Sequence, residues 1–352
     1  MLTLYADIMG ISGSDRCKVA YQEIVNRLET GSQGAGNKPK KITSRYKGKP
    51  SVPKRSPEYV DFVYRQMLAL MQLQDLHKAD FKRRGATDYE IGELEKKGYK
   101  SVEPKNARLL AKKLEEKGIQ LEGIPGFYRN RDDKWEASFY EGNKGYLCPV
   151  YSLDQKIKGF QIRVDHPVNK RKYIWFTSSG FKGGTSSGSP AGISGYISPV
   201  QKNIRVTEGI LKAELASMRS GHSYIGIPGV GNYKSLQPVL MELKSRGLQA
   251  VYECMDMDKM LNLTCRCDCK EKCIWCEKPE RLLKKQECPH KRRKRDTIRK
   301  GCLKLYEMCE TLNLNCMRIS WDTDEKGLWL GTYKGVDDWL YRKLPQEKER
   351  FS

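Results

Sequence analysis

The chain has 352 residues, with 65 lysines and arginines against 43 aspartates and glutamates, which gives a formal net charge of +22. This length allows two or three domains with ordinary hydrophobic cores. The charge favours a polyanionic partner, because neutralising phosphates releases condensed counterions, although a ribosome-associated or merely soluble basic protein is the alternative. Neither a signal peptide nor an apolar run of the ~20 residues that span a membrane occurs, so we expect a cytoplasmic protein without membrane contact.

The amino-terminal third is expected to be largely helical. Residues 1–56 read as a short helical segment followed by a basic linker, because residues 31–56 hold eight Lys or Arg and no acid. Ser56 in front of a proline is typical of a helix start and opens a helical region over 57–120. Within that region Thr87 and Glu90 have the spacing of a capping box.

Short β-type runs replace the helical periodicity from about residue 121. They are separated by turn residues and predict a small mixed or antiparallel sheet within 121–198. The expected strands cover 146–151, 159–164 and 172–177, and the Gly- and Ser-rich residues 178–195 are expected to form a loop.

Strand and helix patterns alternate after residue 198. This alternation predicts an α/β domain over 199–345, with a parallel sheet and helices on both faces. The expected strands are 204–207, 224–227, 249–255 and 316–320, and the expected helices are 210–219, 236–246 and 297–312.

Carboxylates follow two of these expected strands. Glu208 ends one strand, and Asp256 and Asp258 end another. Active groups gather at the carboxyl ends of parallel strands, and three carboxylates meeting there need a hard cation such as Mg²⁺ or Mn²⁺. The alternative is that this Asp-x-Asp belongs to an ordinary turn or helix cap.

Cysteines cluster in one insertion, at about residues 262–296. Six of the 12 cysteines lie between Cys265 and Cys288, which in a reducing cytosol points to metal. A Cys-x-x-Cys with a distant Cys-x-His suits a structural Zn²⁺. We favour Cys273, Cys276 and Cys288 as ligands, with the fourth from Cys267, Cys269 or His290. A two-zinc or redox arrangement, or reduced cysteines without metal, are the alternatives.

A basic run follows the cysteines directly and reads Lys291-Arg292-Arg293-Lys294-Arg295. Ten Lys or Arg and two acids lie within 281–300. Next to the Asp-x-Asp, such a strip suits a nucleic-acid clamp. The alternative is a solvated helix start that is basic.

Four segments together resemble a known family. They are Glu208-Gly209-Ile210-Leu211-Lys212-Ala213, Gly229-Val230, Asp256-Met257-Asp258 and Lys334-Gly335-Val336-Asp337-Asp338-Trp339-Leu340. This pattern resembles the TOPRIM-domain primase-like proteins of bacterial mobile elements and phages, which are related to bacterial replicative DNA primases. The resemblance implies a TOPRIM-like sheet with Glu208, Asp256 and Asp258 as catalytic metal ligands. It also brings Asp337 and Asp338 to the acidic site, with a helix N-cap as their alternative.

The resemblance extends upstream, where residues 145–195 are similar to the primase subdomain that binds template and incoming nucleotide. It implies that Arg163 and Lys172 contact phosphate and that Tyr173 lies near base or sugar. Lys212 departs from the family, which carries an aspartate there, although a lysine can meet phosphate. We also expect the amino-terminal CHC-type zinc domain of replicative primases to be missing, either because the chain is a shortened relative or because its zinc module is encoded separately.

The resemblance implies a primase-like nucleotidyltransferase for mobile-element or phage replication. Its partners would be single-stranded DNA template and nucleoside triphosphates, and a replicative helicase is a further candidate. The alternatives are a TOPRIM-type nuclease and a DNA-binding accessory protein without catalysis, the latter favoured by Lys212 and by the missing zinc domain.

Overall fold

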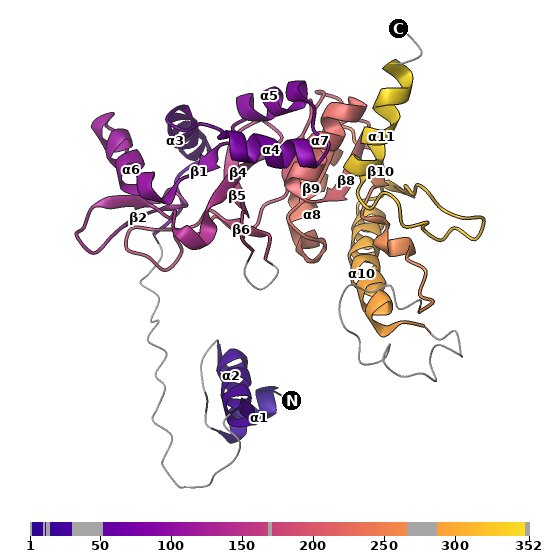
Figure 1. Ribbon diagram of the computed structural model, residues 1–352, viewed down its shortest axis with the longest axis horizontal. Helices are drawn as coiled ribbons and strands as arrows, with labels where there is room; N and C mark the ends of the chain where they lie inside the picture. Colours follow the sequence, from indigo (N-terminus) through magenta and orange to yellow (C-terminus); the bar gives the residue numbers. More distant parts are fainter. Residues whose placement is uncertain are drawn as a thin grey trace. The chain divides into compact units, whose positions relative to one another are not determined.

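The structure is a computed structural model that describes residues 2–9, 11, 15–29, 52–167, 171–265 and 287–348. The chain divides into two compact units, Met1–Lys47 and Gly48–Ser352. In the first unit, helices α1 (Leu2–Ile8) and α2 (Arg16–Glu29) pack together, and Arg16 Nη1 lies 2.8 Å from Asp7 Oδ1 (Figure 1). None of the described helices has both the length and the apolar character of a membrane span.

Helices open the second unit. They are α3 (Pro57–Ala69), α4 (Asp75–Arg83), α5 (Asp88–Lys96) and α6 (Ala107–Glu116). The predicted starts are confirmed: Ser56 Oγ accepts from the Tyr59 amide at 3.3 Å, and Thr87 and Glu90 form a capping box. The sequence did not predict α4, which lacks a side-chain cap at its start.

A four-stranded antiparallel sheet lies next to these helices. Its strands are β1 (Ser101–Val102), β4 (Gly145–Tyr151), β5 (Ile157–Val164) and β6 (Tyr173–Trp175), in the order β1-β4-β5-β6. A separate hairpin joins β2 (Phe127–Arg129) to β3 (Trp135–Ala137). The predicted small antiparallel sheet is therefore confirmed, and the hairpin adds to it.

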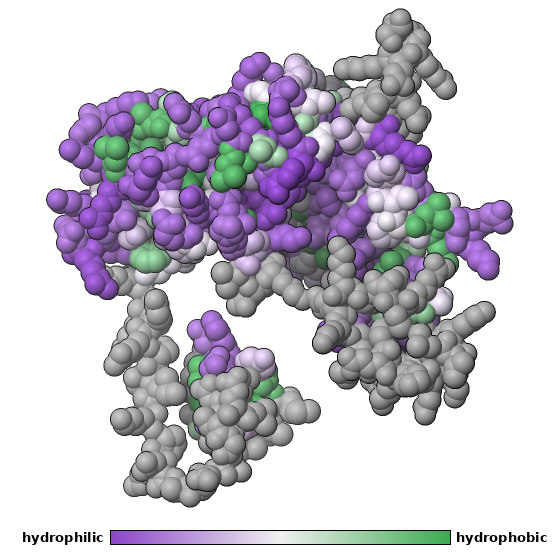
Figure 2. Space-filling view, viewed as in Figure 1, coloured by the Kyte–Doolittle hydropathy of each residue, from purple (hydrophilic) through white to green (hydrophobic). Residues whose placement is uncertain are grey.

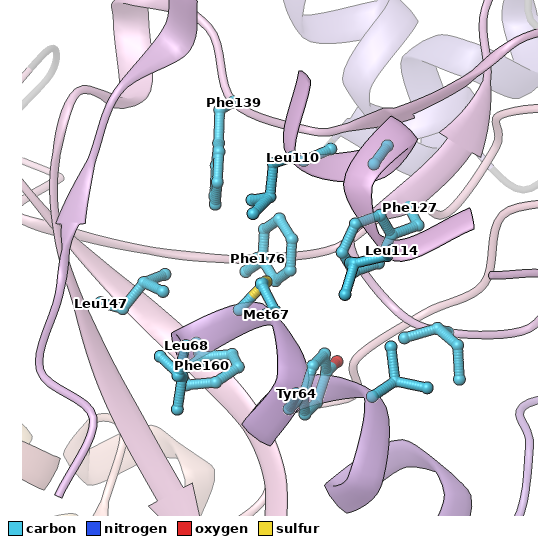
Figure 3. Close-up of a cluster of buried hydrophobic side chains, with 14 of the residues drawn as sticks. Tyr64, Met67, Leu68, Leu110, Leu114, Phe127, Phe139, Leu147, Phe160 and Phe176 are labelled. Atoms are coloured by element: carbon cyan, nitrogen blue, oxygen red, sulfur yellow. The ribbon is translucent and has the colours of Figure 1, made fainter. Parts of the chain in front are cut away.

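This sheet and the helices α3 and α6 share one hydrophobic core, shown in Figure 3. Phe176 lies at its centre, with its ring centroid 4.9 Å from that of Phe139 and 5.7 Å from that of Phe127. Tyr64 packs its ring edge against Phe160 and donates its hydroxyl to the Pro125 carbonyl at 3.0 Å. Burial of this many aromatic rings fixes the sheet against α3.

The second sheet has five strands in the order β11-β10-β8-β9-β7. They are β7 (Gly192–Ser194), β8 (Asn203–Glu208), β9 (Tyr224–Ile227), β10 (Ala250–Glu253) and β11 (Asn315–Arg318). Four strands are parallel, as predicted, but β7 pairs antiparallel with β9. The sheet is therefore mixed, and the expectation of a purely parallel sheet was wrong. Strand β7 was not predicted, because its three residues lie in a Gly- and Ser-rich segment that was expected to be a loop.

Helices cover both faces of this sheet. They are α7 (Ile210–Ser220), α8 (Leu236–Ser245), α10 (Pro289–Thr311) and α11 (Val336–Lys348), with short 3₁₀ helices η4 (Val230–Ser235) and η5 (Met257–Met260). Residues from α8 and α10 form a core with Ile225 and Ile227, whereas α7 and α11 pack around Tyr224. Alternate strand residues point to opposite faces, so the two helix pairs lie on opposite sides. Helix α10 begins at Pro289, earlier than the predicted residue 297, because proline suits the first helical position.

A shared core joins the two sheets through α7. Leu211 and Leu215 of α7 pack with Tyr146 and Cys148 of β4. This contact brings the end of the first sheet next to the helix that follows Glu208 (Figure 1). The displayed face of the molecule in Figure 2 is mainly hydrophilic, as the high content of lysine and arginine leads one to expect.

Candidate active site

Glu208 is the last residue of β8, and α7 begins two residues later. Gly209 between them has φ +99°, a backbone conformation that side-chain-bearing residues rarely adopt. Its amide donates to the Ile227 carbonyl of β9 at 2.6 Å. The glycine therefore allows a sharp turn from strand to helix, which leaves the Glu208 carboxyl group at the carboxyl end of the sheet.

Asp256 and Asp258 follow the neighbouring strand β10 and lie in the turn that forms η5. They are 3% and 1% exposed. The amide of Met257, between them, donates to the Lys334 carbonyl at 2.9 Å, which joins this turn to the segment before α11. Both aspartates are therefore buried at the same end of the sheet as Glu208.

Lysines neutralise both aspartates. Lys212 of α7 forms an ion pair with Asp256 Oδ1. Lys334 Nζ lies 3.1 Å from Asp256 Oδ2 and 2.9 Å from Asp258 Oδ2, so it bridges the two carboxylates. Lys294 Nζ of α10 lies 2.9 Å from Asp258 Oδ1. The two atoms form an ion pair, but their geometry is not that of a hydrogen bond. We call Glu208, Asp256, Asp258 and Asp337, with these three lysines, the acid–lysine cluster.

Asp337 joins the cluster from the first turn of α11. Its Oδ1 atom is buried and has no hydrogen-bond partner. A Cβ atom at Gly335 would collide with this oxygen and would lie 3.0 Å from Lys212 Cε. Glycine at this position therefore lets Asp337 and Lys212 approach each other.

Asp338 behaves differently from its neighbour. Its side chain is exposed, and its Oδ2 accepts from the Gly335 amide at 3.3 Å. This is the geometry of a side chain that caps the start of α11. Of the two adjacent acids, Asp337 is thus the one that faces the cluster.

The carboxyl groups differ in proton affinity. Burial, and then the charge on Asp256, raise the pKa of Glu208, so these two groups lie within electrostatic range. Burial also raises the pKa of Asp256, but Lys212 and Lys334 outweigh it and the net pKa is lowered. Burial raises the pKa of Asp337 to about 6, against an opposing effect of Lys212. Glu208 and Asp337 consequently take up a proton more readily than Asp256.

A buried ion pair positions the aspartate turn. Glu253, at the end of β10, and Lys259, at the end of the turn, are 0% and 2% exposed, with Lys259 Nζ 2.7 Å from Glu253 Oε1. Glu253 also accepts from the Met255 amide and the Tyr306 hydroxyl, at 2.7 and 2.8 Å. Because the Glu253 carboxylate and the Lys259 ammonium both bind partners inside the protein, the pair fixes the backbone that carries Asp256 and Asp258.

Arg219 of α7 performs a similar role for Asp337. Its side chain is fully buried and binds both carboxylate oxygens of Glu90, at 2.7 and 3.2 Å. It also donates to the Gly85 and Asp337 carbonyls, at 3.0 and 2.8 Å. One guanidinium therefore holds together the loop after α4, helices α5 and α7, and the start of α11.

Residues of the first sheet lie next to the cluster. Tyr173 of β6 stacks under the Arg163 guanidinium, 5.5 Å from the ring centroid. Burial raises the pKa of Tyr173 to about 12, with Arg84, Arg163 and Lys212 acting in the opposite direction. Tyr173 thus lies within electrostatic range of Lys212. Lys172 is exposed and only its carbonyl contacts Arg163, at 3.5 Å.

The residues of the predicted basic strip have different partners in the structure. Lys291 donates to the Thr264 carbonyl at 3.1 Å, Arg292 pairs with Glu287, and Arg295 lies 3.9 Å from Asp296. Arg293 is exposed. Lys294, which the sequence interpretation did not single out, is the strip residue that reaches the acids.

Most of the predicted zinc ligands, Cys267, Cys269, Cys273 and Cys276, lie outside the described residues. Cys288 is buried, at 1% exposure, and His290 lies in the first turn of α10. A β-bridge between Thr264 and Glu287 holds together the two ends of the segment that contains the cysteines. The Cys288 amide donates to the Leu263 carbonyl at 2.7 Å and reinforces this closure.

Sequence interpretation missed several residues of the site. Lys334 is the first residue of the motif that carries Asp337, and its place in that motif was the available indication. Arg84, whose Nε donates to Asp80 Oδ2 at 3.1 Å, comes from the unpredicted α4. Neither Arg84 nor Arg219 has any pattern in the sequence that connects it with the distant acids.

The cluster fits a hard divalent cation in its donor chemistry, since carboxylate oxygens are the ligands that Mg²⁺ and Mn²⁺ prefer. The buried Oδ1 of Asp337 has no hydrogen-bond partner and could serve as one ligand. In the present arrangement, however, Lys212 and Lys334 contact the Asp256 oxygens. Within the described parts of the chain, no three Asp, Glu, His or Cys side chains are arranged to hold a metal ion.

The fold is similar to that of bacterial primases. Over 99% of this chain and 68% of the other, it resembles the zinc-binding and RNA polymerase domains of the Aquifex aeolicus primase, with a TM-score of 0.52 and 12% identity. This likeness shows the fold alone.

Two further structures share smaller parts. The RNA polymerase domain of Mycobacterium tuberculosis primase DnaG, in complex with double-stranded DNA, matches 56% of this chain and 64% of its own at 12% identity and a TM-score of 0.40. A DnaG primase catalytic domain bound to single-stranded DNA matches 56% and 61% at 13% identity and a TM-score of 0.37. No family model and no curated protein matches the chain.

Proposed function

We propose that this protein is a primase-like nucleotidyltransferase with a TOPRIM-like domain, which acts on single-stranded DNA template in the replication of a mobile element or phage. The observation that carries this proposal is the convergence of Glu208, Asp256 and Asp337 from three separate elements, at one end of a largely parallel sheet. The primase fold supports it. The division into a helical region (57–120), a template-binding subdomain (121–198) and a TOPRIM-like domain (199–345) belongs to the same proposal.

In this proposal the acids Glu208, Asp256, Asp258 and Asp337 hold Mg²⁺ or Mn²⁺, which would neutralise charge on nucleotide phosphates. The 3′-hydroxyl of the growing strand attacks the α-phosphoryl group and releases pyrophosphate. Asp338 acts mainly as the cap of α11.

Basic residues of both sheets would bind the polyanionic substrates. Arg163 would contact nucleotide phosphates and Tyr173 the base or sugar, and the stacking of these two side chains and the proximity of Tyr173 to Lys212 support this. Exposed Lys172 and Arg293 suit the template backbone, as does the remainder of the strip with Lys291, Arg292 and Arg295. A replicative helicase remains a candidate partner.

We further propose a structural Zn²⁺ bound by four of Cys267, Cys269, Cys273, Cys276, Cys288 and His290. Closure of this segment by the Thr264–Glu287 bridge supports a small metal-stapled insertion. Removal of zinc by a chelator should then lower the melting temperature of the purified protein, and zinc content should approach one ion per chain. Metal analysis with no zinc would contradict this part of the proposal.

Template-directed synthesis tests the main proposal. The full chain is incubated with single-stranded template, labelled nucleoside triphosphates and Mn²⁺ or Mg²⁺, in parallel with Asp256→Ala and a control, Glu325→Ala, whose exposed side chain lies outside the cluster. We expect oligomers from the wild type and the control, and a loss of ~100-fold or more in Asp256→Ala, because a catalytic cation supplies several kcal/mol. Equal synthesis by Asp256→Ala would refute the role of the acids.

A DNA-binding accessory protein without catalysis is the second candidate. The ion pairs of Lys212 and Lys334 with Asp256 favour it, because these lysines already neutralise the acids. Template binding without products would support this candidate. Shortened template would instead indicate a TOPRIM-type nuclease.

A further inference from the structure

The acid–lysine cluster carries its own counter-charges. Asp256 and Asp258 are buried carboxylates, and a buried charge is costly unless it is paired. Three lysines from three different elements provide the pairing: Lys212, Lys294 and Lys334. The cluster is thus close to electrically balanced by protein groups alone.

The lysines are not equivalent in their freedom to move. The Lys212 side chain is 20% exposed and is packed against Gly335, with its Cε only 3.0 Å from where a Cβ would stand. The Lys334 side chain is 49% exposed. A lysine ammonium sits on a flexible four-carbon stem, so Lys334 can turn towards solvent whereas Lys212 is held in place.

Lys334 also occupies the space that a bridging cation would need. Its ammonium lies 3.1 Å from one carboxylate and 2.9 Å from the other. A divalent ion with oxygen ligands at about 2.0–2.2 Å from both aspartates would stand in the same space. The ammonium and the ion therefore exclude each other there.

We infer that Lys334 is a displaceable counter-ion of Asp256 and Asp258, which a divalent cation must expel in order to bind. Lys212 is the fixed counter-charge that stays. This inference rests on the proposed function only in that the acids bind a divalent cation. It predicts that Lys334 weakens metal binding and keeps the aspartates stable when no metal is present.

A titration of the full chain with Mn²⁺ tests the inference. The electron paramagnetic resonance signal of free Mn²⁺ measures how much of the ion is bound. We expect Lys334→Met to bind Mn²⁺ on the order of tenfold more tightly than wild type, as loss of a competing ion pair of this size implies. Lys334→Arg should bind like the wild type. Lys326→Met, which removes an exposed lysine of the same loop, is the matched control and should also bind like the wild type. Asp256→Asn should abolish the binding in every background.

Thermal melting of the same proteins provides a second, independent measurement of Mn²⁺ binding. Mn²⁺ should raise the melting temperature of Lys334→Met more than that of wild type, because tighter binding to the folded state stabilises it more. Equal or weaker Mn²⁺ binding by Lys334→Met, or no binding by either protein, would overturn the inference. Tighter Mn²⁺ binding by Lys334→Met, together with no oligomer synthesis by the wild type, would keep the inference and reject the primase proposal.

Discussion

Two charged clusters lie at the carboxyl end of strand β10, and they differ in how fully their charges are enclosed. The Glu253–Lys259 pair is entirely buried, and its atoms face the Met255 amide, the Tyr306 hydroxyl and the Ile319 carbonyl. The acid–lysine cluster, whose Asp256 and Asp258 lie between Glu253 and Lys259 in the sequence, has a half-exposed lysine and a buried carboxylate oxygen without a hydrogen-bond partner.

This difference separates a structural role from a functional one. An enclosed ion pair with all partners satisfied has nothing to offer to a ligand, but it determines where the following turn lies. The acid–lysine cluster combines the half-exposed Lys334 side chain with the Asp337 Oδ1 atom, which has no hydrogen-bond partner. Both features are typical of a ligand-binding site. The Glu253–Lys259 pair therefore positions Asp256 and Asp258, and the acid–lysine cluster is the part that can bind a ligand.

The largest expected effect is on stability at the enclosed pair. Lys259→Met leaves Glu253 buried without its cation and should lower the free energy of unfolding by about 3–5 kcal/mol. The matched change Lys334→Met in the open cluster should cost no more than ~1 kcal/mol, because that side chain is half-exposed and two other lysines remain. Urea unfolding of both variants measures the difference, and equal losses would remove the distinction between the clusters.

An intermediate effect concerns pH and Asp337. Its pKa is raised from 3.8 to about 6 by burial, with Asp338 and Asp256 in the same direction and Lys212 and Arg219 in opposition. The folded state therefore binds this proton more tightly than the unfolded state. Its contribution to stability is present at low pH and is lost as the pH rises from about 4 to about 6, with a slope of at most about 1.4 kcal/mol per pH unit.

Asp337→Asn removes this titration. We expect the variant to become more stable relative to wild type as the pH rises through this window, and the two to differ by a constant amount above it. Melting temperatures measured at pH 4 to 7 provide the comparison. Parallel profiles of the two proteins over the whole range would show that Asp337 is not buried against the cluster.

The smallest expected effect lies outside both clusters, on α10. Arg293→Ala should weaken binding of single-stranded DNA similarly for all sequences and reduce the slope of log affinity against log salt by ~0.7, the value for one phosphate contact. Lys112→Ala, which removes an exposed lysine of α6, is the control and should leave the slope unchanged. Fluorescence anisotropy at several salt concentrations measures both, and an unchanged slope for Arg293→Ala would exclude its phosphate contact.

The parts of the fold that repeat along the chain could be predicted from the sequence. Alternating strand and helix patterns located β8, β9 and β10, and the rule that active groups gather at the carboxyl ends of parallel strands brought Glu208 and Asp256 together. The start of α3 and the capping box of α5 are local features, which depend on neighbouring residues only. The antiparallel β7 has three residues and no pattern of its own.

The charge partners could not be predicted, because they are far apart in the sequence. Lys212 and Asp256 are 44 residues apart, and Arg219 and Glu90 are 129 residues apart. No spacing rule connects such pairs, since only the packed fold decides which lysine meets which acid. The sequence therefore indicated the acids of the site and Lys212, but it did not indicate that Lys212, Lys294 and Lys334 neutralise these acids.

The central claim is that acids from three elements form one cation site from which Lys334 can be displaced. A crystal structure of the protein soaked in Mn²⁺, with anomalous difference maps, tests it most directly. The account predicts an anomalous peak bound by Asp256 together with Glu208 or Asp258, and a Lys334 side chain turned away from both aspartates. Carboxyl groups of Glu208 and Asp256 that lie far apart, or a Lys334 that still bridges the aspartates at saturating Mn²⁺ with no peak, would contradict it.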